Sequence, residues 1–157
     1  MSDRDCWATP RWLTDLLPLV SLDPCSNERS TVRAERDYRL ARGEDGLRLP
    51  WFGSVYVNPP YSDVKPWAAK LLRSPRVMAA AFLINVDPSV SWWHALTERL
   101  PIALMFRKRI QFVPPPGIKP SSNSKPQALL MDAAFLSMCS DELLATGVLW
   151  RVQEVAA

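Results

Sequence analysis

Hydrophobic residues along this chain fall into short strand-like runs separated by helix-like stripes. Residues 77–84 are almost continuously apolar, which is typical of a strand covered on both faces of a sheet. A shorter run at 54–57 ends at Asn58, and apolar residues recur at helical spacing after Pro66. This alternation predicts an α/β protein with a Rossmann-like, mostly parallel central sheet and helices on both faces.

The remaining elements are predicted from weaker patterns. Thr9 and Pro10 resemble the start of a helix that ends at Pro18. The polar stretch 26–48 is expected to hold a helix and a weak strand near Tyr38. Further segments are a short strand at 20–22, a helix at 91–100, and strands at 102–106, 128–131 and 133–138.

Two polar residues lie at the ends of predicted strands, where α/β sheets bind their ligands. Asp23 follows the strand at 20–22, and Asn58 follows the strand at 54–57. Ligands of such sheets lie at the carboxyl ends of the strands. We therefore expect Asp23 and Asn58 to converge on one crevice.

Composition narrows the classes of function. The 157 residues fit a single domain (1–157), with 48% hydrophobic and 22% charged residues. Three cysteines, far apart, and one histidine argue against a disulfide framework and against a metal site. No apolar stretch is long enough to span a membrane, and the N-terminus is too polar for a secretion signal, so we expect a cytoplasmic protein.

Positive charge is concentrated after the strand at 102–106. Arg107, Lys108 and Arg109 precede a proline- and serine-rich loop, 112–127, that also carries Lys119 and Lys125. A net charge of +3 is weak evidence by itself, and a solvated basic loop is an equally good interpretation. The functional hypothesis is that these residues contact the phosphates of double-stranded DNA.

The tetrapeptide Asn58-Pro59-Pro60-Tyr61 suits methyl transfer to an exocyclic amine. The lone pair of adenine N6 is delocalised into the ring, and two acceptors for its hydrogens would restore that lone pair. The Asn58 side-chain oxygen and the next carbonyl can accept them, held in place by the stiff prolines. Tyr61 offers a flat face for a base that has left the duplex. A chance Asn-Pro-Pro turn is the alternative interpretation.

These residues resemble the N6-adenine methyltransferases found in bacteriophages and prophages. The similarity runs in order through most of the chain: Trp7-Ala8-Thr9-Pro10, Leu22-Asp23-Pro24-Cys25-Ser26, Asp45-Gly46-Leu47, Trp51, Val57 to Ser62, and Arg109-Ile110-Gln111-Phe112. The resemblance implies S-adenosylmethionine as cofactor and, for a gene of a phage or prophage, the cytoplasm of the bacterial host.

The resemblance also implies roles for individual residues. Trp7, Thr9 and Pro10 would wall the methionine end of the cofactor, and Asp23 with Pro24 would lie beside it. Asp45 would meet the adenine amine of the cofactor. Asn58 would bridge the methyl donor and the target amine. From the residues alone, Trp7 could instead fill the core, and Asp23 or Asp45 could be a cap or a turn residue.

One feature departs from the wider class of methyltransferases. The segment that follows the first-strand acid, Asp23 to Asn27, contains no glycine. S-adenosylmethionine has no phosphate and does not need a glycine-rich phosphate cradle. Three alternatives stay open: methylation of cytosine N4, methylation of a protein glutamine, or a nucleic-acid-binding relative without activity. Because a methyltransferase core uses nearly the whole chain, we expect a short or relaxed recognition sequence.

Overall fold

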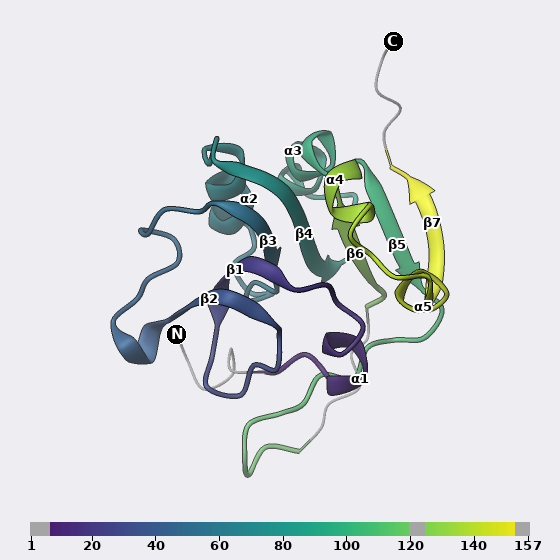
Figure 1. Ribbon diagram of the computed structural model, residues 1–157. Coiled ribbons are helices and arrows are strands. Elements are labelled where there is room, and N and C mark those ends of the chain that lie inside the picture. The colour runs from purple at the N-terminus through teal and green to yellow at the C-terminus, as the bar shows by residue number, and fades with distance from the viewer. Residues whose placement is uncertain (1–6, 120–124, 153–157) are drawn as a thin grey trace.

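A computed structural model describes residues 7–119 and 125–152, and the strands in these residues form one seven-stranded sheet (Figure 1). The order of the strands across the sheet is β2-β1-β3-β4-β6-β5-β7. The strands are β1 (Val20–Ser26), β2 (Ala34–Arg39), β3 (Gly53–Val57), β4 (Val77–Asn85), β5 (Ile102–Phe106), β6 (Gln127–Met131) and β7 (Gly147–Arg151). The helices are α1 (Arg11–Thr14), α2 (Lys65–Leu72), α3 (Ser91–Arg99), α4 (Ala133–Leu136), α5 (Asp141–Leu144) and the 3-10 turn η2 (Leu40–Arg42).

The sheet is mixed, which corrects the expectation of a mostly parallel one. Strand β1 pairs in parallel with β2 and β3, and β3 pairs in parallel with β4. The other half of the sheet is antiparallel, because β6 opposes both β4 and β5, and β7 opposes β5. Since β6 is reversed against both of its neighbours, β5 runs in the same direction as β4. Strands β1 to β5 therefore share one direction.

Helices cover both faces of the sheet, as the sequence predicts. Helices α2 and α3 pack on one face, whereas α1, α4 and α5 pack on the other (Figure 1). The two faces alternate along each strand, as they must in a pleated sheet. In β4, for example, Phe82 and Ile84 belong to the first core and Ala81 and Leu83 to the second.

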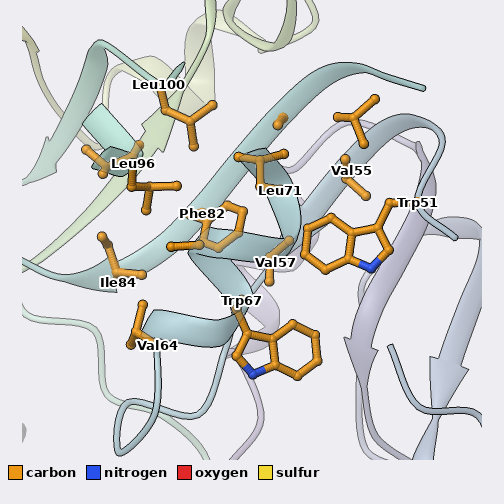
Figure 2. Packing of buried hydrophobic residues seen from close by; sticks show 14 of the residues in the cluster. Trp51, Val55, Val57, Val64, Trp67, Leu71, Phe82, Ile84, Leu96 and Leu100 are labelled. Atoms are coloured by element: carbon orange, nitrogen blue, oxygen red, sulfur yellow. The ribbon is translucent and has the colours of Figure 1, made fainter. Parts of the chain in front are cut away.

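The first core is built around aromatic rings between α2 and the sheet. Trp51 and Trp67 stack with their ring centroids 6.1 Å apart, and Phe82 lies 6.4 Å from Trp51 (Figure 2). Trp51 and Phe82 are fully buried. Offset and tilted aromatic contacts of this kind are favourable and bury much apolar area. They hold α2, and the loop that precedes it, firmly against the end of β3.

Two expectations for local structure were wrong. The stretch 26–48 contains strand β2 around Tyr38, as expected, but only the 3-10 turn η2 in place of the expected helix. A turn at Glu28 and Arg29 leads the chain back to β2. This segment is held by Thr14, whose hydroxyl lies 2.6 Å from that of Thr31, and by Arg33, whose Nη2 donates to the Leu17 carbonyl at 2.6 Å. The strand expected at 133–138 is instead the short helix α4, and β7 had no counterpart among the expected elements.

The predicted N-terminal helix is shorter than expected. Helix α1 ends at Thr14, four residues before Pro18. Pro10 is its N-cap residue rather than its first residue, and no side chain caps it. The Thr9 side chain does not cap α1 and can therefore make a hydrogen bond elsewhere.

Candidate active site

The carboxyl ends of five strands meet at one edge of the sheet, here called the carboxyl edge. Strands β1 to β5 end, in chain order, at Ser26, Arg39, Val57, Asn85 and Phe106. Asn58 follows β3 directly. Asp23 lies in β1, one residue beyond Leu22, and Leu22 pairs with Val55 of β3. The basic residues from Arg107 on follow β5 at the same edge. The structure thus brings most of the predicted site residues to one side of the molecule.

Asn58 is held by the segment that precedes α1. Its Nδ2 donates to Oγ1 of Thr9 at 3.2 Å, and that Oγ1 lies 3.3 Å from the hydroxyl of Tyr56. Thr9 and Tyr56 are both buried, which makes the contact rigid. Because the amide nitrogen of Asn58 is engaged, its Oδ1 stays available as an acceptor at the carboxyl edge. Pro59 beside it is buried and Pro60 half-buried.

The N-terminal segment is pinned to the loop after β5. Ala8 and Val113 exchange backbone hydrogen bonds of 3.0 and 2.9 Å. This bridge places half-buried Trp7 and buried Pro10, the neighbours of Thr9, close to the tetrapeptide that begins at Asn58. Thr9 and Asn58 are 49 residues apart in the chain. Segments remote in sequence therefore form one wall of the site.

Tyr61 closes the tetrapeptide with a neutral aromatic side chain. Its ring meets Phe112 edge to face, with the centroids 5.6 Å apart. The hydroxyl is buried and has no hydrogen-bond partner among the described residues. Burial raises the pKa of Tyr61 well above 10, so the phenol keeps its proton at neutral pH. Phe112 was noted in the sequence only as part of a motif, and the structure gives it this contact.

Asp23 is a buried carboxyl group inside β1, three residues before the strand ends at Ser26. Its Oδ1 accepts from the Cys25 amide at 3.1 Å, and its Oδ2 accepts from the Ser30 hydroxyl at 3.4 Å. Burial raises the pKa of Asp23 to about 7, against the effect of these hydrogen bonds. In the same loop, Nη1 of Arg29 is buried without a hydrogen-bond partner among the described residues. Neither Ser30 nor Arg29 could be recognised from the sequence, because only the turn between β1 and β2 brings them here.

Asp45 lies in a turn that packs against the end of β1. Its Oδ1 accepts from the Leu47 amide at 2.9 Å, and its Oδ2 lies 3.2 Å from Nε of Arg48. A Cβ atom on Gly46 would stand 1.8 Å from the carbonyl oxygen of Pro24. Only glycine permits this approach, so the Asp45 turn and Pro24 are neighbours because position 46 has no side chain.

A pocket opens beside Tyr61, on the side of the tetrapeptide toward β4. It is lined by Tyr61, Val64, Asn85, Asp87, Val90, Trp92 and Lys125. Asp87 accepts from Lys125 through Oδ2 at 3.1 Å, so Lys125 forms part of the pocket wall. Of these seven residues, only Tyr61 and Lys125 were predicted from the sequence as site residues. Asn85 and Asp87 could have been suspected, because they follow the strongest apolar run in the chain.

Basic side chains extend from the carboxyl edge after β5. Arg107, Lys108, Arg109 and Lys119 are exposed. The middle of the predicted DNA-contacting loop, residues 120–124, lies outside the described residues.

No helix within 7–119 or 125–152 is both long and apolar enough to cross a membrane. Over the same ranges, no three or more His, Cys, Asp or Glu side chains gather in a way that could hold a metal ion.

Comparison with known proteins identifies the family. The family model described as DNA N-6-adenine-methyltransferase (Dam) matches residues 1–146. A protein of Haemophilus phage HP1 (strain HP1c1) named DNA N-6-adenine-methyltransferase is 28% identical over 141 residues, covering 83% of this chain and 79% of its own. The match agrees with the resemblance carried by the tetrapeptide and the N-terminal motif. The chain therefore belongs to the DNA N-6-adenine-methyltransferase (Dam) family and is a methyltransferase that acts on adenine in DNA.

Proposed function

We propose that the enzyme takes its methyl group from S-adenosylmethionine and transfers it to N6 of an adenine turned out of duplex DNA, with Asn58 at the point of transfer. The observation that carries this proposal is the orientation of Asn58. Its amide nitrogen is engaged by Thr9, which directs Oδ1 to accept a hydrogen from the target amine. The Asp23 region lies on one side of Asn58, and the Tyr61 pocket on the other.

The residues on the Asp23 side fit the proposed cofactor. When bound, S-adenosylmethionine supplies a methyl group activated by the positive sulfonium. The buried, unpaired guanidinium nitrogen of Arg29 suits the carboxylate of the methionine portion, and the Asp23 carboxyl suits a hydrogen-bond donor. Trp7, Thr9 and Pro10 would wall the same end. Asp45 and Pro24, next to each other, would receive the adenine portion.

The residues of the tetrapeptide would act on the target amine. Asn58 Oδ1 and the carbonyl of Pro59 accept the two hydrogens of N6, which concentrates the lone pair on nitrogen. These acceptors stabilise the positive charge that develops on N6 during transfer. They need no reorganisation, because the loop is stiff and the residues that hold Asn58, Thr9 and Tyr56, are buried. The proton leaves after transfer, so no general base is required. Tyr61, neutral and aromatic, packs against the base.

The basic loop would hold the duplex. Arg107, Lys108, Arg109 and Lys119 are exposed at the carboxyl edge, where phosphates on either side of the turned-out base would pass. Lys125 and the rest of 112–127 would complete this surface. Because the methyltransferase core uses nearly the whole chain, little besides this loop is left to read bases, which supports a short or relaxed recognition sequence.

The arrangement of the sheet also supports this proposal. Strands β1 to β5 share one direction, helices cover both faces, and the site lies at the carboxyl edge. These features support a Rossmann-like methyltransferase sheet in which β6 and β7 are reversed.

The test is transfer of labelled methyl from S-adenosylmethionine to unmethylated duplex DNA, followed by nucleoside analysis. We expect label in N6-methyladenine with the wild type. Asn58→Ala should lower kcat about 10²- to 10³-fold, the usual effect of removing one preorganised group. Asn58→Asp retains an acceptor and should keep more activity than Asn58→Ala.

Calorimetric titration with S-adenosylmethionine separates binding from chemistry. We expect wild type and Asn58→Asp to bind the cofactor at similar affinity, because Asn58 acts mainly on the amine. An Asn58→Ala enzyme with full activity would contradict the proposed role of the tetrapeptide. Label in a base other than adenine would contradict the proposed acceptor.

A further inference from the structure

Asn85 occupies a position from which it can touch the target base. It is the last residue of β4, the strand beside β3, and it lines the same pocket as Tyr61 of the catalytic tetrapeptide. Across the sheet it pairs with Gln127, the first residue of β6. No motif in the sequence marks Asn85, and Gln127 was expected only as the last residue of the DNA-contacting loop 112–127, whereas it begins β6.

The orientation of Asn85 is fixed by a chain of hydrogen bonds that begins at the backbone. The amide N–H of Ile110 can only donate, and it donates to Oε1 of Gln127 at 3.0 Å. The Gln127 Nε2 must then face the other way, where it donates to Oδ1 of Asn85 at 3.0 Å and to the Lys125 carbonyl at 2.6 Å. Gln127 is 2% exposed, so water cannot substitute for these contacts. Asn85 therefore has its oxygen engaged and its Nδ2 left to the pocket.

The other charged groups of the pocket are already paired. Asp87 accepts from Lys125 at 3.1 Å and from Ser89 through its backbone amide at 3.3 Å. Among the described residues, Asn85 Nδ2 is left as a donor to the pocket, and the buried Tyr61 hydroxyl, which can donate or accept, has no partner. A pocket with a donor left over selects a ligand that offers an acceptor.

We propose that Asn85 Nδ2 donates a hydrogen bond to N1 of the target adenine and that Gln127 positions it, an inference that rests on the proposed function. On the Watson–Crick edge of adenine, N1 is an acceptor next to the N6 amine. With Asn58 accepting from N6, a donor is needed beside it for N1. Guanine and thymine carry an N–H at the equivalent position. Two donors would then face each other without an acceptor, so these bases would be rejected. Asn85 is therefore a specificity residue, and Gln127 is a positioning residue.

The test pairs a protein change with a substrate change. Duplexes carry adenine, 1-deazaadenine or 7-deazaadenine at one mapped methylation site, and kcat/KM is measured for the wild type and Asn85→Ala. Replacing N1 by C–H should cost the wild type at least about tenfold, and Asn85→Ala should lose about as much on adenine. For Asn85→Ala, kcat/KM on 1-deazaadenine should be nearly the same as kcat/KM on adenine. The change from adenine to 7-deazaadenine should affect both proteins equally.

Asn85→Asp and Gln127→Met extend the test. Asn85→Asp replaces the donor by an acceptor and should fall below Asn85→Ala on adenine. Gln127→Met frees Asn85 to rotate and should reduce discrimination against 1-deazaadenine, whereas Gln111→Met, at an exposed position of the segment that also contains Ile110, should not. Thermal unfolding and cofactor titration of each variant show that the loss is not one of folding.

The outcomes separate this inference from the function on which it rests. Full discrimination against 1-deazaadenine by Asn85→Ala, or coupling to N7 instead of N1, would overturn the role of Asn85 while leaving adenine methylation intact. A wild type that transfers no methyl group to any adenine would overturn both.

Discussion

Asp23 carries a carboxyl group into the interior of the protein, where two hydrogen-bond donors meet it. Burial outweighs those donors and raises its pKa from an ordinary 3.8 to about 7. Between these values the folded protein keeps a proton that the unfolded chain has released. The contribution of Asp23 to the free energy of unfolding must therefore fall as the pH rises from about 4 to about 7, and it stays constant above that range.

Asp23→Asn should remove this pH dependence. The variant keeps an oxygen for the Cys25 amide and carries no charge to bury. We expect it to unfold at higher temperature than the wild type at pH 8, by a difference in free energy on the order of a few kcal/mol, and to converge with it toward pH 4. Thermal unfolding across this range measures the difference. Asp63→Asn, at an exposed position, is the control, and equal pH profiles for wild type and Asp23→Asn would contradict the prediction.

At the residue scale, the site was predictable where chemistry needs a particular side chain next to a strand end. Asn58, Thr9 and Asp23 were expected near one another, and Asn58 and Thr9 are in contact. The roles of Arg29 and Gln127 were not predicted, because such a polar side chain finds its partners among residues that are far away in the sequence. Asn85, for instance, is oriented only once β4 and β6 lie side by side.

At the scale of elements, the central strands were the easiest to predict and the direction of the others the hardest. The apolar run of β4 is buried on both faces, so local sequence is enough to recognise it. Whether β6 runs parallel or antiparallel to its neighbours depends on how the chain connects β5 to β6, and no local sequence pattern predicts that connection. The run at 133–138 is apolar but too short to distinguish strand from helix by spacing. Asp132 decides it by capping α4.

Asp132 joins three elements and should be a point of high sensitivity. Its Oδ1 accepts from the Phe135 amide at 2.8 Å, and its Oδ2 accepts from the Ala80 amide of β4 at 3.1 Å and from Arg99 of α3 at 2.6 Å. Asp132→Ala removes the cap and leaves a buried amide and a guanidinium unpaired. We expect a loss of about 2–4 kcal/mol in the free energy of unfolding, measured by denaturant titration.

The matched comparison is Ser140→Ala, which removes only a cap. The Ser140 hydroxyl accepts from the Leu143 amide at 3.2 Å at the start of α5 and makes no contact to β4. This variant should lose about 1 kcal/mol. Equal losses for Asp132→Ala and Ser140→Ala would show that the contacts of Asp132 to Ala80 and Arg99 contribute nothing.

At the scale of the whole molecule, the positive charge is divided between two regions with different partners. Where β2 ends, toward one side of the carboxyl edge, Arg39 and Arg42 are paired with Asp37, and Arg42 also with Glu44. Where β5 ends, toward the other side of that edge, Arg107 and Lys108 are exposed on the segment that leads to Phe112 and Val113. The net charge of +3 therefore understates the field near the proposed DNA surface.

This placement predicts how DNA affinity depends on salt. Each phosphate contact that is lost should reduce the slope of log K against log salt concentration by about 0.9, because one fewer counterion is released. The double variant Arg107→Ala/Lys108→Ala should therefore bind duplex DNA more weakly at low salt, with a slope shallower by about 1.8 if both residues touch phosphate. Fluorescence anisotropy of a labelled duplex over a salt series measures both. Arg73→Ala/Arg76→Ala removes the same charge from exposed positions before β4, at the opposite edge of the sheet. If the two double variants lose affinity and slope equally, the effect is that of net charge alone, and the carboxyl edge is not the surface that holds DNA.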